Sequence, residues 1–217
     1  MIKKIKDIIK ELAKEEEKTK IVIVDPSTLS REQPDSGHPE PDMRVLGLFT
    51  TIEEEKNAEL IHAMLYLNEI NKLEKNKDKR RPIDFYISTY GGCADDMFAI
   101  YDAMRQIREE TEIHTIGLGK VMSAGVLILA AGTKGHRQIG KYCRVMIHSV
   151  IAGSHGSLPN LANEMEAIQQ IQEDYIEALV FETKMTKEDI KNMLERKVNV
   201  YLSAEEAVKL GIADIII

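Results

Sequence analysis

Two residues that can do chemistry each follow an apolar segment in the middle of the chain. Ser123 lies between IHTIGLG, a β-branched run bounded by glycine, and the small apolar run AGVLILAAG. These patterns predict a buried strand and then a short buried helix. The free N–H groups of the first helical turn can stabilise an oxyanion beside the Ser123 hydroxyl. His148 ends a second apolar segment, CRVMIH, and imidazole suits proton transfer near neutral pH. Ser123 and His148 are therefore candidates for nucleophile and base.

Each of the two residues also has a purely structural interpretation. A serine at a helix start is usually an N-cap, and a lone histidine at a strand end is more often a satisfied polar group. Neither residue predicts an enzyme by itself, so the motifs around them decide.

The flanking motifs resemble those of one family, in the same order and with comparable spacing. They are YISTYGG, AIYDAMRQI, GKVMSAG with LAAG and RVMIH, and YLSAEEAVKLGIADII. Together they are similar to the proteolytic subunit of the Clp protease family, a self-compartmentalised serine peptidase. The resemblance covers roughly residues 44–217.

The resemblance implies a fold, an activity and a set of site residues. The fold is α/β, a repeated β-β-α superhelix shared with crotonases, with a protruding handle helix. The activity is that of a serine endopeptidase that cleaves unfolded polypeptides without a cofactor or metal, with Ser123 and His148 as catalytic residues. The second glycine of the Gly91-Gly92 pair and the residue after the nucleophile, Ala124, then supply the oxyanion-hole N–H groups.

The third catalytic position departs from the family, which has an aspartate just before the aromatic-Leu-Ser-Ala run. Here that position is Asn199. An amide oxygen can orient the histidine but cannot stabilise the imidazolium by its charge. We expect reduced activity. Glu195 is a less favoured substitute for the missing acid, and a weak or silent ring subunit working with an active paralogue is the alternative function.

The resemblance also implies partners. They are a homo-oligomer of stacked heptameric rings, joined by the helix predicted over residues 158–183, and a hexameric AAA+ unfoldase ATPase. Tyr86 keeps one of the aromatic positions at which such an ATPase docks, whereas Asp84 and Gln106 stand where aromatics are common. The usual docking is therefore in question.

Composition limits the remaining function classes. Apolar residues make up 43% of the 217 residues, and no apolar run approaches the ~20 residues that span a bilayer. The formal charge of −7 argues against nucleic acid as the main partner. The two cysteines lack metal-site spacing, and the N-terminus lacks a signal peptide's apolar region, which predicts a cytoplasmic protein.

The chain divides by pattern into two parts. Residues 1–43 form an N-terminal extension, with an amphipathic helix over 3–18, a short strand at 21–24 and a polar loop over 25–42. A propeptide, a pore element and a solvated extension all stay open for it. Residues 44–217 form the peptidase domain, with strands in MRVLGLF, IDFYIST and 212–217 and helices over about 51–70, 94–108 and 158–183. A further helix begins after Thr186.

The helix over about 51–70 has a broad apolar face that includes Leu65 and Ile70, and the helix over 158–183 has an apolar stripe that includes Met165 and Tyr175 and is most simply core. Residues 149–157 are predicted as a strand or a loop that could pair with an extended peptide.

Two other enzyme classes fit less well. A crotonase-type acyl-CoA enzyme shares the core and the oxyanion hole, but the Ser/His pair and the RVMIH segment oppose it. An α/β-hydrolase is disfavoured because Ser123 lacks a glycine two residues before it.

Overall fold

The computed structural model describes residues 44–195 and 199–217. The helix, strand and loop predicted within residues 1–43 lie outside the described residues, and so does the predicted boundary of the extension.

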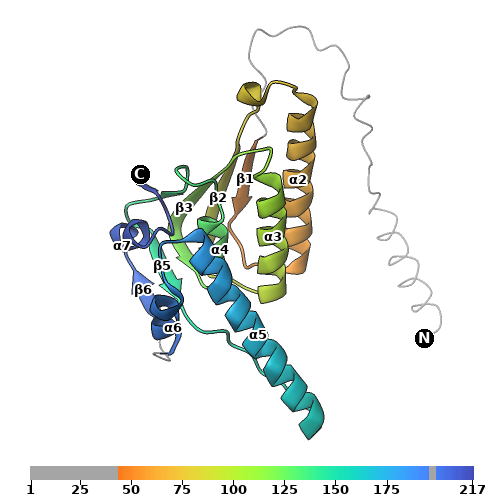
Figure 1. Ribbon diagram of the computed structural model, residues 1–217, viewed down its shortest axis with the longest axis vertical. Coiled ribbons are helices and arrows are strands. Elements are labelled where there is room, and N and C mark those ends of the chain that lie inside the picture. Colours follow the sequence, from red (N-terminus) through yellow and green to blue (C-terminus); the bar gives the residue numbers. More distant parts are fainter. Residues whose placement is uncertain (1–43, 196–198) are drawn as a thin grey trace, which may run out of the picture. The chain divides into compact units, whose positions relative to one another are not determined.

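The described residues form an α/β fold around one seven-stranded sheet (Figure 1). Five strands run in the order β1-β2-β3-β4-β7, while β5 pairs with β3 and β6 pairs with β5. Every pairing is parallel except that of β5 with β6. The strands are β1 (Val45–Leu48), β2 (Ile83–Thr89), β3 (Ile113–Met122), β4 (Gln138–Ile139), β5 (Arg144–Ile147), β6 (Val200–Leu202) and β7 (Ile215–Ile216). The predicted α/β class is confirmed.

The helices connect these parallel strands, as the crossovers of a parallel sheet require. They are α2 (Glu54–Leu73), α3 (Ala94–Ile107), α4 (Ala124–Ala130), α5 (Leu158–Glu182), α6 (Lys187–Glu195) and α7 (Ala204–Lys209), with a 3₁₀ turn η2 (Lys77–Lys79). Figure 1 shows α2 and α3 side by side against the sheet, and α5 extending away from it. None of these helices is long and apolar enough to cross a membrane.

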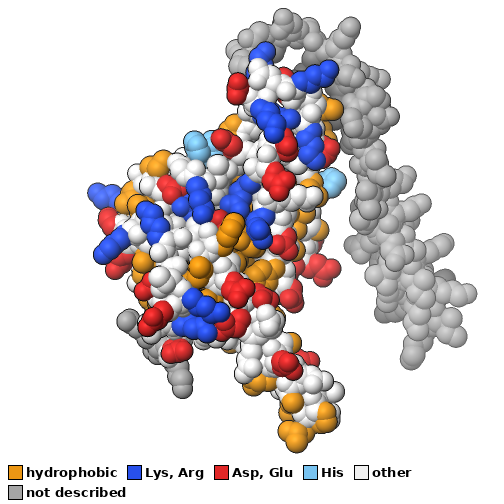
Figure 2. Space-filling view, in the orientation of Figure 1, with side chains coloured by type: hydrophobic (Ala, Val, Ile, Leu, Met, Phe, Trp, Pro, Cys, Tyr) orange, Lys and Arg blue, Asp and Glu red, His pale blue; other side chains and the backbone are white. Residues whose placement is uncertain are grey.

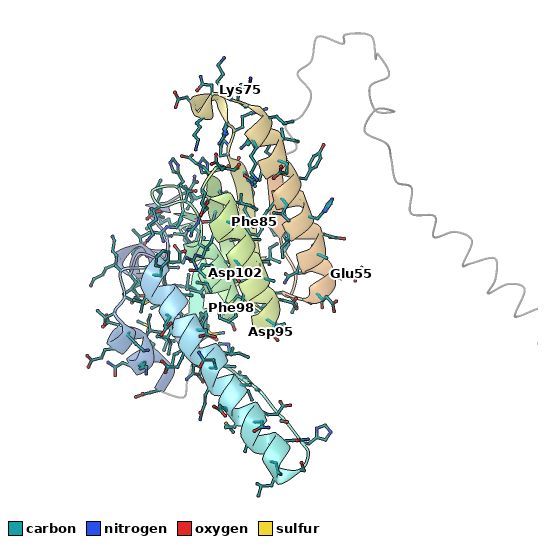
Figure 3. The ribbon with its side chains drawn as sticks, turned by 45° about the vertical axis from the view of Figure 1, so that its right-hand side comes forward. Glu55, Lys75, Phe85, Asp95, Phe98 and Asp102 are labelled. Carbon is teal, nitrogen blue, oxygen red and sulfur yellow. The ribbon has the colours of Figure 1, made fainter. Side chains whose placement is uncertain are left out.

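Alternation along β2 shows which face of the sheet is covered. Ile83, Phe85 and Ile87 are fully buried, whereas Asp84 and Tyr86 between them are partly exposed. Side chains alternate between the faces of a strand, so one face of β2 packs against the helices and the other is only partly covered. Figure 3 shows Phe85 between the sheet and the helix pair.

The helix predicted over residues 51–70 forms, but its start and its buried face differ from the prediction. It begins at Glu54 after Glu53, and Leu65 and Ile70 of the predicted apolar face are exposed. Three asparagines are buried instead: Asn57, Asn68 and Asn71. The amide of Asn71 donates to Thr111 Oγ1 at 2.9 Å, and Thr111 in turn donates to Asn68 Oδ1 at 2.7 Å. These hydrogen bonds offset the cost of burying polar groups.

The long helix α5 is anchored only at its C-terminal end. There Tyr175, Ile176 and Leu179 are buried. The fully buried Glu182 accepts two hydrogen bonds from Arg108, at 3.1 and 2.7 Å.

The predicted apolar stripe of α5 is therefore core over only part of its length. Leu158 is 80% exposed and Met165 is 56% exposed. Figure 2 shows hydrophobic side chains at the free end of this helix. The simple interpretation of the whole stripe as core is wrong, because Met165 is exposed and Leu161 and Ile168 are only partly buried.

The C-terminal segment is fastened by one buried arginine. Arg137 donates from Nε and Nη2 to the two oxygens of Asp214, at 2.8 and 2.6 Å, and from Nη1 to the carbonyls of Ala130 and Glu182. Burial favours the neutral acid of Asp214. The hydrogen bonds and charge of Arg137, with the N–H groups of Gly135 and Arg137, outweigh this effect and lower the pKa of Asp214. The last strand is shorter than predicted, because Ile212 is buried in the turn before it.

Candidate active site

Ser123 stands at the junction of β3 and α4, where the sequence predicts it. Its backbone has φ 54° and ψ −126°, and it is the one non-glycine residue with positive φ among residues 44–195 and 199–217. This conformation is sterically unfavourable for an L-residue and costs on the order of 1–3 kcal/mol. It turns the chain sharply from strand to helix, as at the nucleophile of a serine hydrolase.

Hydrogen bonds from two other elements hold Ser123 in this conformation. Its N–H donates to the carbonyl of Met146 on β5 at 2.8 Å. Its carbonyl accepts from the N–H of Val126 at 3.0 Å and from the hydroxyl of Tyr175 on α5 at 3.2 Å. The backbone of Ser123 is thus fixed by β5, α4 and α5 together.

The glycine pair after β2 packs directly against this turn. Gly91 has φ +100°, and a Cβ there would lie 2.7 Å from Ser123 Cβ and 2.9 Å from the Met122 carbonyl. A side chain at position 91 would therefore push the serine out of place. Gly91 is required here both for its backbone conformation and for the close approach.

Gly92 pairs with Ile52 in an isolated parallel bridge, in which the residues on either side of Gly92 make the hydrogen bonds and the N–H of Gly92 makes none of them. The N–H of Ile52 donates to Gly91 and the N–H of Cys93 donates to Ile52, both at 2.9 Å. Within the described residues, the N–H groups of Gly92 and Ala124 donate to no protein acceptor. Gly92 and Ala124 line the same pocket as Ser123, so both N–H groups are available to a ligand.

His148 comes immediately after β5 and lines that pocket. Pairing of Met122 with Met146 sets β5 beside the end of β3 and brings His148 to the same edge of the sheet as Ser123. The pocket has a volume of about 330 Å³. Its polar wall includes Ser123, His148 and Ser149, and Val150, Ile151 and Ile171 form part of its apolar wall. Among the described residues, His148 has no hydrogen bond with the Ser123 hydroxyl.

Asn199 lies beside His148 in register but outside the pocket. In the antiparallel pair of β5 and β6, Ile147 faces Val200, where the pairing ends. Continued by one residue, the same register would set His148 opposite Asn199. The side chain of Asn199 is exposed and does not line the pocket. Glu195, the other acid considered, ends α6 and is also exposed.

Tyr175 is a site residue that the sequence did not reveal as one. The periodicity of α5 predicts it only as part of an apolar stripe, yet its hydroxyl reaches Ser123 and its ring lines the pocket. Burial raises the pKa of the Tyr175 phenol well above its ordinary value, so the group stays a hydrogen-bond donor at neutral pH. A phenol placed among aliphatic residues was the available signal, since a buried tyrosine hydroxyl needs a partner.

Two further predictions concern the segment after His148 and the positions at which an ATPase would dock. Residues 149–157 form no strand, so the loop alternative of the prediction holds. Tyr86 is partly exposed on β2 and Gln106 is exposed on α3. Asp84 Oδ1 lies 3.4 Å from His114 Nδ1. No group of three metal-ligating side chains among the described residues lies in the Ser123 pocket.

The chain is similar to known proteins over most of the described residues. The family model described as Clp protease matches residues 41–217. The ATP-dependent Clp protease proteolytic subunit 1 of Prochlorococcus marinus subsp. pastoris (strain MED4) is 32% identical over 141 residues, which are 65% of this chain and 70% of the relative. The protein of the same name from Prochlorococcus marinus strain MIT 9312 is 29% identical over 174 residues, 80% of this chain and 84% of the relative.

Proposed function

The chain belongs to the Clp protease family, and from this premise we propose that it is a serine endopeptidase subunit that cleaves unfolded polypeptides. In this proposal Ser123 is the nucleophile, His148 is the general base, and Asn199 occupies the position of the third catalytic residue. Gly92 and Ala124 supply the oxyanion hole.

The observation that carries the proposal is the backbone of Ser123. A strained conformation persists only where its surroundings impose it, and such residues cluster at active sites. Here the strain aims a serine side chain into a pocket that also contains a histidine and two N–H groups without a protein acceptor. An N-cap serine needs no such conformation, because N-cap residues are usually extended. Ser123 also makes no side-chain cap hydrogen bond.

The proposed reaction proceeds in two halves. The Ser123 hydroxyl attacks the peptide carbonyl carbon as its proton passes to His148, and the resulting oxyanion accepts hydrogen bonds from Gly92 and Ala124. Collapse breaks the C–N bond, and His148 returns the proton to the leaving amine. Water then attacks the acyl-enzyme with His148 again as base, which releases the second product and restores Ser123.

We propose that Asn199 reduces the rate of this reaction. Its amide oxygen can accept from the N–H of the imidazole, but it carries no charge to stabilise the imidazolium. In a trypsin-type triad, replacing aspartate by asparagine lowers kcat by about 10⁴. We expect a loss of kcat smaller than this figure, because Asn199 is exposed and water beside it can solvate the charged histidine in the transition state.

We propose that the substrate binds as an extended peptide along residues 149–157, which form no strand and whose first three residues line the pocket. The apolar wall formed by Val150, Ile151 and Ile171 would receive an apolar side chain of the substrate.

The proposal extends to assembly and partners. The uncovered half of α5 supports its role as a handle between two stacked heptameric rings. The name of the relatives, ATP-dependent Clp protease proteolytic subunit, supports a separate ATPase as partner. We propose the cytoplasm as the location, as the sequence predicts. Docking of that ATPase would differ from the family pattern at Asp84 and Gln106.

A catalytically weak or silent ring subunit is the second candidate. Two observations favour it: the Ser123 hydroxyl and His148 share the pocket without a hydrogen bond, and Asn199 lies outside the pocket. In this case the active sites would belong to a paralogous subunit of the same ring.

Labelling with a fluorophosphonate probe separates the two candidates. We expect the probe to modify Ser123 in the assembled protein, and Ser123→Ala to abolish labelling. Ser149→Ala is the matched control, because Ser149 lines the same pocket and should not be the nucleophile. An unlabelled but intact assembly, or modification at Ser149, would sink the assignment and favour the silent subunit.

A further inference from the structure

A second group of chemically active side chains lies far from the Ser123 pocket, at the other end of β3. Glu112 immediately precedes this strand and His114 is its second residue, and His136 lies in the turn before β4. Ser123 follows the end of β3, nine residues after His114. At about 3.3 Å per residue this separation is roughly 30 Å. The two groups of residues are therefore independent sites.

The three side chains are close enough to share one ion. One ligand atom from each of Glu112, His114 and His136 lies within 4.8 Å of the others. His114 Nε2 is 3.2 Å from Glu112 Oε2, and the imidazole rings of His114 and His136 stack with centroids 4.4 Å apart and planes 10° apart. Because an imidazole nitrogen binds a metal in the plane of its ring, one of the two stacked rings must rotate for both to bind the same ion. Two ligands at 2.0–2.1 Å from a tetrahedral zinc ion are about 3.3 Å apart, so the His114–Glu112 pair already has the required spacing.

A fourth residue orients His114 in the manner of a metal ligand. His114 Nδ1 lies 3.4 Å from Asp84 Oδ1, because the parallel register of β2 and β3 pairs these two residues directly. Histidines that bind a metal through one ring nitrogen usually donate the other ring N–H to a carboxylate. The contact between Asp84 and His114 is at an ion-pair distance and is not a hydrogen bond, and a rotation of the ring that aims Nδ1–H at Asp84 would hold Nε2 near Glu112.

The contacts of His114 also call for a cation. Both ring nitrogens face carboxylate oxygens, at 3.2 and 3.4 Å. A neutral imidazole has only one N–H, so one of these two contacts would place a nitrogen lone pair against an oxygen lone pair. A metal ion between Nε2 and Glu112, with the proton kept on Nδ1, removes that repulsion. A proton on each nitrogen is the other way to remove it.

We propose that Glu112, His114 and His136 bind a divalent transition metal ion, with zinc as the best fit, and that Asp84 positions His114 for it. Two imidazole nitrogens and one carboxylate oxygen suit zinc and disfavour magnesium and calcium, which prefer all-oxygen sites. The ion fastens the start of β3 to the turn before β4. Water or a group from another molecule completes the coordination.

Zinc titration of the full-length protein by isothermal calorimetry tests the site. We expect one zinc ion per chain at this site, lost in His114→Ala and in His136→Ala. Glu112→Gln should weaken binding strongly, and Asp84→Asn should weaken it by about 10- to 100-fold, as removal of such an orienting carboxylate does. His62→Ala is the matched control, because His62 is exposed on α2 outside this group and should bind unchanged.

Thermal unfolding supplies the second measurement. Zinc should raise Tm of the wild-type protein and of Ser123→Ala equally, because an ion that binds only the folded state stabilises it. His114→Ala should abolish the increase, and circular dichroism of the zinc-free variant checks that it folds. The proposal is overturned if zinc binding survives in both histidine variants or is lost in His148→Ala instead. Absence of stoichiometric binding to wild type would leave a proton as the occupant and would equally overturn it. None of these outcomes depends on peptidase activity, so they are separable from a failure of the proposed function.

Discussion

Ser123 is held in its strained backbone conformation from three directions. Met146 binds its N–H, Tyr175 binds its carbonyl, and Gly91 leaves room for its Cβ. These contacts come from β5, α5 and the turn after β2. Because each can be altered without touching the serine itself, positioning and chemistry can be tested separately.

The first residue-scale prediction concerns Asn199. If Asn199 only orients His148, then Asn199→Asp adds a charge that stabilises the imidazolium in the transition state. We expect kcat for peptide hydrolysis to rise tenfold to a thousandfold, which is about 1.4–4 kcal/mol of barrier. The acid limb of kcat/KM should move to higher pH, since a nearby carboxylate favours the charged ring.

The control for this prediction is Glu195→Gln. If Glu195 already acts as the third catalytic residue, this change abolishes activity, and Asn199→Asp gains nothing. An unchanged or lower kcat in an intact Asn199→Asp assembly would contradict the orienting role.

The second residue-scale prediction concerns Gly91. Gly91→Ala should lower kcat by at least tenfold, because the new Cβ would lie 2.7 Å from Ser123 Cβ and displace the nucleophile. Steady-state kinetics on an assembled variant measures this. Gly135→Ala is the matched control: it has a similar φ of +90°, but a Cβ there meets nothing within 4 Å.

Backbone strain should cost both glycine variants about 1–2 kcal/mol of stability. Gly91→Ala should lose more, because its Cβ also lies too close to Ser123 and to the Met122 carbonyl. Only Gly91→Ala should lose activity. Equal kinetic effects of the two changes would refute the packing argument.

At the scale of elements, one arginine fastens three parts of the fold. Arg137 contacts the carbonyls at the ends of α4 and α5 as well as Asp214 before β7. Its side chain is buried, so it depends on Asp214 for a compensating charge. The burial of Arg137 beside β4 and β7 is therefore stabilised by the ionised form of Asp214.

The element-scale prediction follows from the lowered pKa of Asp214. A carboxyl group with a lowered pKa in the folded state contributes stability above its ordinary pKa, and this contribution is lost as the pH falls through the lowered value. Urea unfolding should show Asp214→Asn less stable than wild type at pH 7. The difference should shrink below about pH 4, the ordinary range of an aspartate, as the wild-type carboxyl group becomes neutral.

The control for this comparison is Asp102→Asn, since Asp102 is exposed on α3 and has no ion pair among the described residues. It should change little at either pH. A stability difference for Asp214→Asn that stayed constant with pH would contradict the argument.

At the scale of the whole molecule, helix α5 extends beyond the sheet and helices that pack against its C-terminal part. Part of the C-terminal half of α5 packs in the core, while Leu158 and Met165 stay exposed. Hydrophobic side chains are visible at the free end of this helix (Figure 2). An exposed apolar stripe of this kind marks an interaction surface. Closed symmetric assemblies are the usual way to cover such a surface.

The prediction at this scale is an assembly of about fourteen subunits by light scattering at micromolar concentration, in keeping with stacked rings. Met165→Asp should shift the mass toward single rings, because it places a charge on the apolar stripe of the handle. Glu166→Gln, an exposed polar neighbour, is the control and should assemble normally. A monomeric or dimeric wild-type protein would contradict the assembly.

The sequence by itself determined the larger strands and helices of residues 44–217 and the strand ends next to Ser123 and His148, but it did not predict β4, β6 or α7. Local patterns suffice for this, because strand alternation, helical spacing and glycine punctuation act over a few residues. It also predicted that the Gly91-Gly92 pair lies between a strand and a helix. The predicted helix start at Thr186 is confirmed, since the Thr186 hydroxyl accepts from the N–H of Asp189 at 3.1 Å.

Only the tertiary structure decided which faces are covered and which distant residues meet. An apolar stripe shows that a helix has apolar side chains that burial would stabilise. How many of them are buried depends on how far the rest of the fold extends along the helix, so Leu158 and Met165 of α5 stay exposed. The meeting of Tyr175 with Ser123 and of Asp84 with His114 depends on packing and strand register. These contacts join residues tens of positions apart, and no local pattern encodes them.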